Sequence, residues 1–343
     1  MFHYAILAHP GHNRIYFQTA LAVANHEIEA IMAGQGITLR RFTELTLGLP
    51  ACISFETDQA IEGEALKALA AASLFYALFQ IHEDGRLSPV AAPQWQHFPE
   101  SLSQILKYTG KTNEQFTRLM VNLAHSACRT GSERLRLVDP MCGKGTTLYE
   151  GLIHGFDVEG IEINTKWVQE IQAYMVKFLK TGKYKHKLVK AKRNDAKGKK
   201  VADQLVIETA ADKADYAAGR VQQFKLCGAD TRQAQWLLKR NSCDLLVSDL
   251  PYGVQHGSKN AKDTKLDRSA LTLLEEALPG WHQGLKSGGA LALSFNEFTM
   301  KWKEVAELLA HQGFEVLDTP PYTGFLHRVD QSINRNLILA VKA

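Results

Sequence analysis

The chain has 343 residues, of which 45% are hydrophobic and 22% are charged, a composition typical of a folded protein with one large or two ordinary cores. No stretch reaches the ~18 consecutive apolar residues of a membrane span, and the N-terminus lacks the basic-then-apolar plan of a secretory signal. The five cysteines form no C-x-x-C pair, so we expect reduced thiols in a cytoplasmic protein with neither a disulfide framework nor a zinc site.

The net charge of +4 is distributed unevenly along the chain. Between Lys177 and Lys200 there are eleven Lys or Arg residues and a single acid, Asp195, a local excess of +10 that leaves the rest of the chain at −6 (+4 less +10). A solvated loop is the ordinary interpretation of a lysine run. Because the whole positive excess lies in one segment, the pattern favours contact with a phosphate backbone.

Residues 1–95 predict a small α+β domain. An apolar run is followed by helical spacing of apolar residues, two strand-like runs, a second helix and two more short strands. These segments are 3–8, 12–32, 37–42, 51–57, 62–73, 74–81 and 86–90. The order β-α-β-β-α-β is the split pattern of ferredoxin-like domains. The proline- and aromatic-rich stretch APQWQHFPE then indicates a linker, which we place at residues 96–110.

Residues 111–343 show a different pattern of strand-like and helical segments. After a helix at 111–128, short strand-like runs alternate with helices, which predicts an α/β fold with parallel strands in a doubly wound sheet. The strand-like runs are 135–140, 157–163, 223–230, 243–250 and 289–296, and the helices lie near 146–154, 165–180, 231–239, 268–285 and 299–312. The last two runs, 314–322 and 336–343, have no helix between them and should pair antiparallel. The basic segment 181–222 is expected to be an insertion with little strand or helix.

The stretch LVDPMCGKGTTLYEG is a strand that ends on an acid, followed by a Gly-x-Gly turn and a helix. Gly143 and Gly145 let the backbone approach a bulky ligand, and Thr146 can cap the helix. A P-loop is excluded because Lys144 is followed by glycine, and a dinucleotide fingerprint lacks its third glycine near Leu148. The remaining interpretation is a nucleoside-containing ligand with a cationic, amino-acid-like end, such as S-adenosylmethionine.

An acid stands at the end of four successive strands of this predicted sheet. Ligands of open α/β sheets bind at the carboxyl ends of the strands, where the strand order reverses. Asp139 suits the cationic part of the ligand, Glu162 suits two ribose hydroxyls, and Asp230 suits the adenine amine. The fourth acid is Asp249. Acids that occur in turns by chance are the alternative.

The motifs DPMCGKGT, GIEIN, GADTR, DLPYG and FLHRVDQSINRN resemble those of class I S-adenosylmethionine-dependent methyltransferases, and more narrowly the tRNA guanosine-N2 methyltransferases and their THUMP-domain relatives. The resemblance covers residues 111–343 and implies a seven-stranded, doubly wound Rossmann-like sheet with an antiparallel last strand. The cofactor contacts that it implies are Asp139, Pro140, Cys142, Gly143, Gly145, Thr146, Glu162, Ile163, Asp230 and Thr231, with Thr112, Asn113 and Phe116 from the preceding helix. We recognise no THUMP domain in residues 1–95 and map no family segment onto residues 181–222.

The stretch DLPYG predicts where the chemistry takes place. A base amine is a poor nucleophile, because its lone pair is delocalised into the ring. To attack the sulfonium methyl group it must be placed in line with it, and acceptors must hold its N–H groups. Asp249 and the Leu250 carbonyl are the predicted acceptors, and Pro251 fixes the direction of that carbonyl. Tyr252 offers a face for base stacking, worth roughly 1–3 kcal/mol, and Gly253 frees the backbone. A simple turn explains the proline and the glycine, but not the acid and the aromatic residue.

We therefore expect an RNA methyltransferase that transfers a methyl group from S-adenosylmethionine to an exocyclic base amine, with guanine N2 in tRNA as the favoured target. The predicted RNA contacts are Gly253, His327, Arg328, Lys183, Lys185 and Lys187. His327, Arg328 and Arg335 are placed in the loop between the last two strands. No metal and no membrane partner are expected. The open alternatives are a methyltransferase for guanine N2 or adenine N6 of ribosomal RNA or DNA, a non-catalytic RNA-binding module, and a nicotinamide oxidoreductase.

Overall fold

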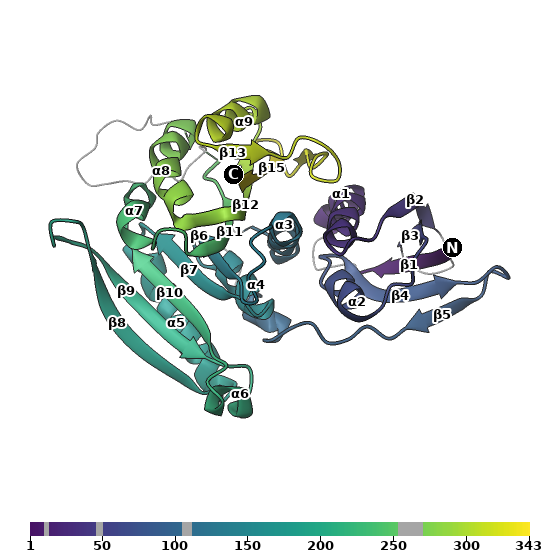
Figure 1. Ribbon diagram of the computed structural model, residues 1–343, viewed down its shortest axis with the longest axis horizontal. Helices are drawn as coiled ribbons and strands as arrows, with labels where there is room; N and C mark the ends of the chain where they lie inside the picture. The colour runs from purple at the N-terminus through teal and green to yellow at the C-terminus, as the bar shows by residue number, and fades with distance from the viewer. Residues whose placement is uncertain (10–13, 46–50, 105–111, 253–269) are drawn as a thin grey trace.

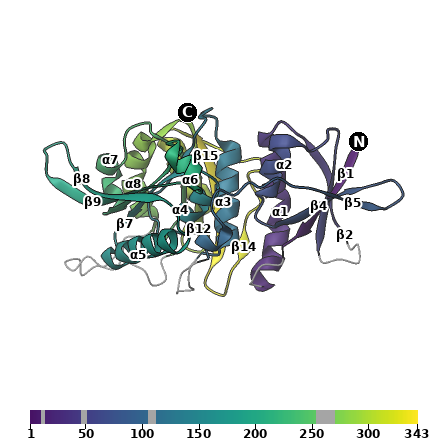
Figure 2. The same cartoon turned by 90° about the horizontal axis from the view of Figure 1, so that it is seen from below.

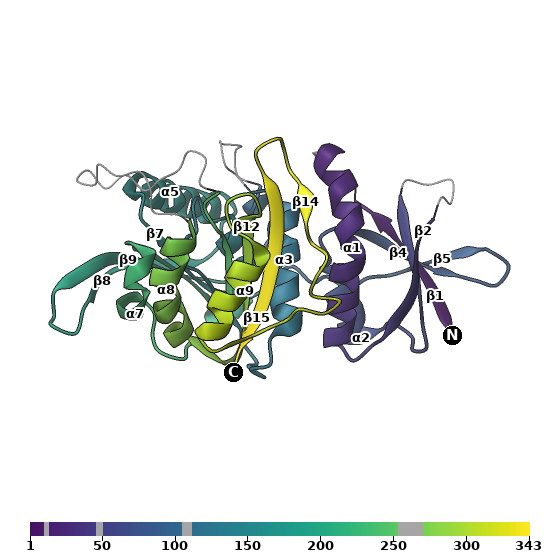
Figure 3. The same cartoon turned by 90° about the horizontal axis from the view of Figure 1, so that it is seen from above.

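The computed structural model describes residues 1–9, 14–45, 51–104, 112–252 and 270–343. Two β-sheets lie on either side of a central pair of helices, α1 and α3, which run side by side (Figures 1, 2 and 3). Among the described helices, none is long and apolar enough to cross a lipid bilayer.

The N-terminal sheet has five antiparallel strands in the order β2-β3-β1-β4-β5. Its elements are β1 (Phe2–Ala8), α1 (Arg14–Gly34), β2 (Leu39–Leu45), β3 (Cys52–Thr57), α2 (Gly63–Ala70), β4 (Phe75–Ile81) and β5 (Leu87–Val90). Strand β1 lies between β3 and β4, so each helical crossover skips one strand, as in the split βαβ pattern. The ferredoxin-like prediction is confirmed, with β5 added at the edge.

The second sheet follows the order β13-β15-β12-β11-β6-β7-β10-β9-β8, with β14 paired to β15. Its strands are β6 (Arg136–Asp139), β7 (Asp157–Glu162), β8 (His186–Asn194), β9 (Lys200–Thr209), β10 (Gln222–Gly228), β11 (Cys243–Asp249), β12 (Leu285–Asn296), β13 (Phe314–Val316), β14 (His327–Arg328) and β15 (Asn334–Lys342). The helices of this part are η1 (Glu100–Leu102), α3 (Glu114–Ala127), α4 (Thr146–Ile153), α5 (Thr165–Thr181), α6 (Lys213–Ala217), η2 (Thr231–Gln233), α7 (Ala234–Leu237), α8 (Ala270–Gly284) and α9 (Trp302–His311).

Seven of these strands form the predicted doubly wound sheet. Strands β10, β7, β6, β11 and β12 are parallel neighbours, and β15 runs antiparallel between β12 and β13. The strand order reverses at β6, because the chain first builds outward through β7 and β10 and then returns to place β11 on the other side. A crevice for ligands is therefore expected at the carboxyl ends of β6 and β11.

Residues 181–222 differ from the prediction. They form a long hairpin, β8 and β9, that extends the sheet at the edge of β10, followed by the short helix α6. Leu205 and Ile207 of β9 are buried in the core, whereas β8 is an edge strand whose lysines are exposed. Charged side chains on an edge strand prevent pairing with other chains, and they mask the alternation that predicts a strand.

A buried carboxylate connects the two parts of the molecule. Glu27 of α1 is 0% exposed, and its Oε1 accepts hydrogen bonds from the Ser73 backbone N–H at 2.8 Å and from Nδ2 of Asn122 in α3 at 2.7 Å. Its Oε2 accepts from the Ser73 hydroxyl at 2.5 Å. Burial raises the pKa of Glu27. Residues of the predicted linker also pack closely, since Phe98 and Leu102 are buried.

Candidate active site

The loop between β6 and α4 is held in a shape that depends on glycine. Gly143 and Gly145 have φ of 55° and 88°, in the left-handed region that favours glycine. The Gly145 N–H donates to the Cys142 carbonyl at 2.7 Å, and the Cys142 N–H donates to Ile161 of β7 at 3.0 Å. Gly160 of β7 lies so close that an added Cβ would be 2.9 Å from the Cys142 Sγ. The loop is therefore packed directly on β7.

Asp139 lies at the end of β6, directly before this loop. It is 2% exposed, and its Oδ1 accepts hydrogen bonds from the Ser248 hydroxyl at 2.8 Å and from the Met141 N–H at 3.1 Å. Burial raises the pKa of Asp139 to about 6. In the described part of the chain no cationic side chain pairs with it, so a cationic ligand would supply the missing charge.

Glu162 and Asp230 follow the next two strands and differ in their partners. Glu162 is 6% exposed, accepts from the Asn164 N–H at 2.7 Å, and has its pKa raised to about 7 by burial. Asp230 accepts from the Arg232 N–H at 2.9 Å and from the Arg232 Nε at 3.0 Å. An adenine amine at Asp230 would therefore share this carboxylate with an arginine, whereas Glu162 has no cationic partner among the described residues.

Asp249 ends β11, beside β6. The Tyr252 hydroxyl donates to Asp249 Oδ1 at 2.5 Å, and the Thr112 hydroxyl donates to Oδ2. Tyr252 also accepts from the Arg335 Nε at 2.8 Å, and burial raises the pKa of Tyr252. An ionised carboxylate has about four lone-pair sites, so the two hydroxyls orient Asp249 and leave acceptor capacity for a substrate amine.

Tyr252 lies beside a cluster of three packed side chains, Phe116, His327 and Arg335. The Arg335 guanidinium carbon lies 4.4 Å from the Phe116 ring centroid and 5.5 Å from that of Tyr252. The His327 ring meets the edge of Phe116 at 5.4 Å, and its Nδ1 donates to the Phe325 carbonyl at 2.8 Å. Burial lowers the pKa of His327 to about 4, so the ring is neutral and Nε2 is an acceptor, without a hydrogen-bond partner among the described residues.

The prediction that His327 and Arg335 lie in a loop is wrong. They belong to β14 and β15, where they are paired in register, and they are 9% and 5% exposed. Arg328 is exposed, and its guanidinium donates to the backbone carbonyls of Asp330 and Gln331. The long-range pairing of β14 with β15 buries two polar side chains that the sequence placed in a loop.

The structure brings most of the predicted cofactor residues to one edge of the sheet. Thr146 begins α4, Asn113 caps α3 by accepting from the Gln115 N–H at 2.8 Å, and the Thr231 hydroxyl accepts from Trp281 at 2.9 Å. The remaining cofactor residues are the buried Pro140, Cys142 and Phe116, the half-buried Gly143, and Ile163, which is 37% exposed. Of the predicted catalytic residues, Leu250 is buried and Pro251 is half-buried. The predicted substrate residue Gly253 lies outside the described residues.

The lysines predicted as RNA contacts lie at the opposite end of the strands, level with the amino end of β10. Lys183, Lys185 and Lys187 are exposed where β8 begins. There His186 is paired with Thr209, which is paired with Gln222 at the start of β10. The acids lie at the carboxyl ends of the parallel strands, so these lysines are separated from them by the length of the sheet.

Two residues at the site were missed in the sequence. Ser248 donates to Asp139, as described above, and so joins the ends of β6 and β11. Ser294 of β12 lies 3.4 Å from the Tyr252 hydroxyl through its Oγ, and its carbonyl accepts from the Leu250 N–H at 2.8 Å. Each is a polar residue, 0% exposed, within an apolar strand, and such an interruption is the signal that could have revealed them.

The donor set fits S-adenosylmethionine. When bound, this cofactor supplies a methyl group on a positively charged sulfur. Asp139 is a buried carboxylate without a cationic partner in the described residues, and Glu162 is a second such acid one strand away. Asp139 would hold the cationic end and Glu162 the ribose hydroxyls, while the glycines of the loop leave room for the ligand.

Several solved structures and one family model are similar to this chain. No curated protein sequence matches the chain. Among solved structures, TrmN from Thermus thermophilus is 12% identical with 100% of both chains covered and a TM-score of 0.42. A TehB-like S-adenosylmethionine-dependent methyltransferase from Corynebacterium glutamicum is 14% identical over 67% of this chain and 97% of that chain, with a TM-score of 0.36. An rRNA methylase from Streptococcus thermophilus is 11% identical over 68% of this chain and 99% of that chain, with a TM-score of 0.34.

The decisive match is to a family described as "RMKL-like, methyltransferase domain", over residues 106–311. The matched region is more than half of the chain and contains the glycine loop and all four acids at the strand ends. With the expected strand order and a donor set that fits the cofactor, the chain belongs to this family of RMKL-like methyltransferase domains and is an S-adenosylmethionine-dependent methyltransferase.

Proposed function

We propose that this methyltransferase acts on RNA and methylates an exocyclic base amine, with guanine N2 in tRNA as the target. The observation that carries the proposal is the position of Asp249. Its carboxylate is oriented by two hydroxyl donors, and its strand is joined to the cofactor acid Asp139 through Ser248. An amine held at Asp249 would therefore be next to the methyl group of the bound cofactor.

The residues of the site have separate roles in this proposal. Asp249 and the Leu250 carbonyl accept the N–H groups of the amine and stabilise the positive charge that develops on its nitrogen. Pro251 keeps that carbonyl in a fixed direction. Tyr252 orients Asp249 through its hydroxyl, and Arg335 fixes Tyr252. A base within paired RNA must first be turned out of the helix to reach the site.

His327 supports guanine rather than adenine. Guanine presents the N1–H donor beside its N2 amine, whereas adenine has a lone pair at N1 beside its N6 amine. His327 Nε2 is a buried acceptor near the site, and the charges of Arg335 and Asp249 both act on its ring. An acceptor would attract the N1–H of guanine and repel the N1 lone pair of adenine. The motif resemblance to tRNA guanosine-N2 methyltransferases favours the same target.

The test is the variant Asp249→Ala, assayed on unmodified tRNA with labelled S-adenosylmethionine. We expect methyl transfer to fall by at least about 10²-fold, while the cofactor Kd measured by calorimetry stays within about twofold because Asp139 and Glu162 are intact. The control is Asp58→Ala, which removes an acid that is 61% exposed and paired with Arg40. Mass spectrometry of the nucleosides identifies the product. Transfer at the wild-type rate by Asp249→Ala, or a product other than N2-methylguanosine, would contradict the proposal.

A further inference from the structure

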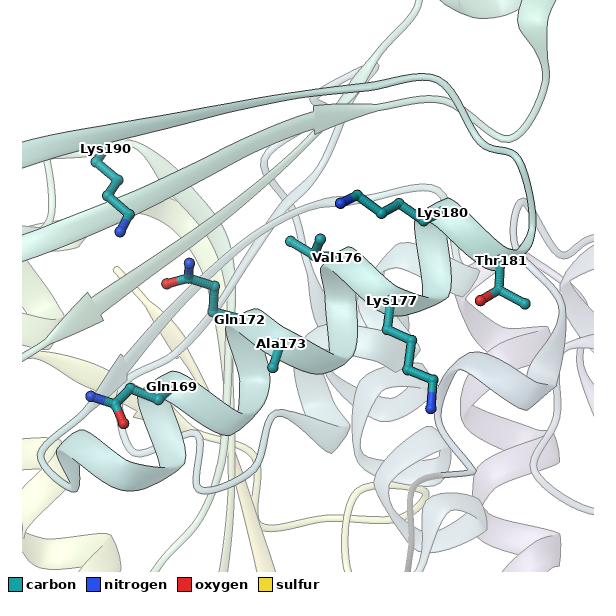
Figure 4. A pocket seen from close by; sticks show the side chains of 8 residues that line it. All are labelled: Gln169, Gln172, Ala173, Val176, Lys177, Lys180, Thr181 and Lys190. Carbon is teal, nitrogen blue, oxygen red and sulfur yellow. The ribbon is translucent and has the colours of Figure 1, made fainter.

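A groove lies between α5 and the β8–β9 hairpin, outside the cluster of acids. Its volume is about 610 Å³. Three lysines line it, Lys177 and Lys180 from the helix and Lys190 from β8, together with Gln169 and Gln172. In Figure 4, Lys190 extends from the hairpin toward Gln172, Lys180 lies along the side of the helix that faces the hairpin, and Lys177 points away from the hairpin. The groove thus has positive charge on both of its sides.

These lysines are not neutralised by the protein. Among the described residues no acid lines the groove, and none of the three lysines forms an ion pair. Other basic residues nearby are paired. Lys144 lies 2.8 Å from Glu170, and Lys200 lies 2.7 Å from Asp203. The three groove lysines are thus available to a ligand, unlike Lys144 and Lys200.

The groove begins beside the cofactor loop. Gln169 at one end of the groove precedes Glu170, which forms the ion pair with Lys144 of that loop. Lys180 is ten residues further along α5, about 15 Å at the rise of an α-helix. The turn of the hairpin, residues 195–199, also extends beyond the carboxyl end of β10, because Cys227 is already paired with Gln204 of β9. A chain molecule that reaches the site can therefore continue along α5.

The lining suits phosphate groups rather than bases or a lipid surface. Ammonium and amide groups above a floor of Ala173 and Val176 offer donors to phosphate and ribose oxygens, but no aromatic face on which a base could stack. Acidic lipids carry the same charge as RNA, but a flat bilayer cannot enter a recess between a helix and a hairpin.

We infer that this groove binds the phosphodiester backbone of the RNA substrate on one side of the target nucleotide. The inference rests on the proposed function for the identity of the nucleic acid. The contacts that it names, Lys177, Lys180 and Lys190, lie in addition to the predicted Lys183, Lys185 and Lys187. Each phosphate contact releases counterions, so the groove contributes affinity that depends strongly on salt and little on sequence.

The experiment compares three triple variants of the full chain. The first changes Lys177, Lys180 and Lys190 to Glu, and a milder version changes the same residues to Gln. The control changes Lys213, Lys239 and Lys303 to Glu, three exposed lysines outside the groove. RNA affinity is measured by filter binding to tRNA over a range of salt concentrations, and the cofactor Kd by calorimetry reports correct folding.

We expect the groove variant to bind tRNA at least about tenfold more weakly than the control, with the Gln version between them. The slope of log affinity against log salt should become shallower by about 2 to 3 units, the loss of three phosphate contacts. An affinity and a slope equal to those of the control would overturn the inference, as would loss of binding to phosphatidylserine vesicles with tRNA binding unchanged.

The outcome separates the groove from the reaction. If the wild-type protein methylates no RNA but the groove variant still loses tRNA affinity, the proposed function fails and the groove assignment stands. If the wild-type protein methylates tRNA and the groove variant binds and methylates as the control does, the groove assignment fails and the proposed function stands.

Discussion

Lowering the pH should weaken binding of S-adenosylmethionine by protonating Asp139. This carboxylate is 2% exposed, and burial raises its pKa from the ordinary value of 3.8 to about 6. A cationic ligand interacts favourably with the ionised form alone. Binding therefore competes with protonation between about pH 7 and pH 5.

The magnitude follows from the pKa of about 6. At pH 7.5 only about 3% of Asp139 is protonated, whereas at pH 5 about nine-tenths is. If the cofactor binds the ionised form, its Kd rises about tenfold between these values, or about 1.4 kcal/mol. Glu162, with its pKa raised to about 7, adds to the effect at the upper end of the range.

The stability of the ligand-free protein should respond to Asp139 in the opposite direction. Its pKa in the folded protein is above the unfolded value, because the ionised form is buried without a cationic partner in the described residues. The contribution of Asp139 to stability is therefore fully present below about pH 4 and is lost as the pH rises through about 6. General acid unfolding would instead lower cofactor affinity and stability together.

Calorimetry from pH 5 to 7.5, repeated in buffers of different ionisation enthalpy, measures both the Kd and the protons released on binding. Asp139→Asn should bind more weakly at pH 7.5 and should lose most of the dependence between pH 5 and 6.5. The pH dependence of the Kd that remains near pH 7 is due to Glu162. A wild-type Kd that is constant from pH 5 to 7.5, or an Asp139→Asn variant that keeps the full dependence, would refute the assignment of Asp139 to the cationic end of the cofactor.

Two further substitutions examine contacts that join distant parts of the chain. Tyr252→Phe removes the hydroxyl that orients Asp249 and accepts from Arg335, so we expect kcat to fall about tenfold with the cofactor Kd unchanged. Steady-state kinetics on tRNA measures this, and an unchanged kcat would contradict the orienting role. Glu27→Leu leaves three buried donors without their acceptor, so chemical denaturation should show a loss of about 3–5 kcal/mol in the free energy of unfolding. If Glu27→Leu lowers the free energy of unfolding no more than Glu64→Leu, at an exposed position, the hydrogen bonds of Glu27 contribute little to stability.

Local patterns in the sequence were sufficient to predict the two sheets. The ferredoxin-like order and the doubly wound sheet follow from short apolar runs alternating with helices, and the antiparallel last strand follows from the missing crossover helix. The acids at the strand ends were also predictable, because Asp139, Glu162, Asp230 and Asp249 each follow an apolar run directly. Parallel strands bring their carboxyl ends to one edge, so position in the chain predicts position in space.

The β8–β9 hairpin could not be predicted in the same way. Lysines on both faces of β8 remove the alternation that identifies a strand, and the pairing is stable because β9 buries Leu205 and Ile207 against the core. The direction of the hairpin then decides which basic residues lie near the cofactor edge. As a result Lys190 lies in the groove, whereas Lys187, three residues earlier, lies near the opposite edge.

Residues close together in the chain specify the class of fold, the glycine loop and the acids that surround it, so these features were predictable. The surroundings of Asp249 depend on contacts between distant residues. Tyr252 and Arg335 are separated by 83 residues, and Thr112 is 137 residues away from the carboxylate that it contacts. Such contacts depend on the register of β15 and the packing of α3, which no local pattern encodes.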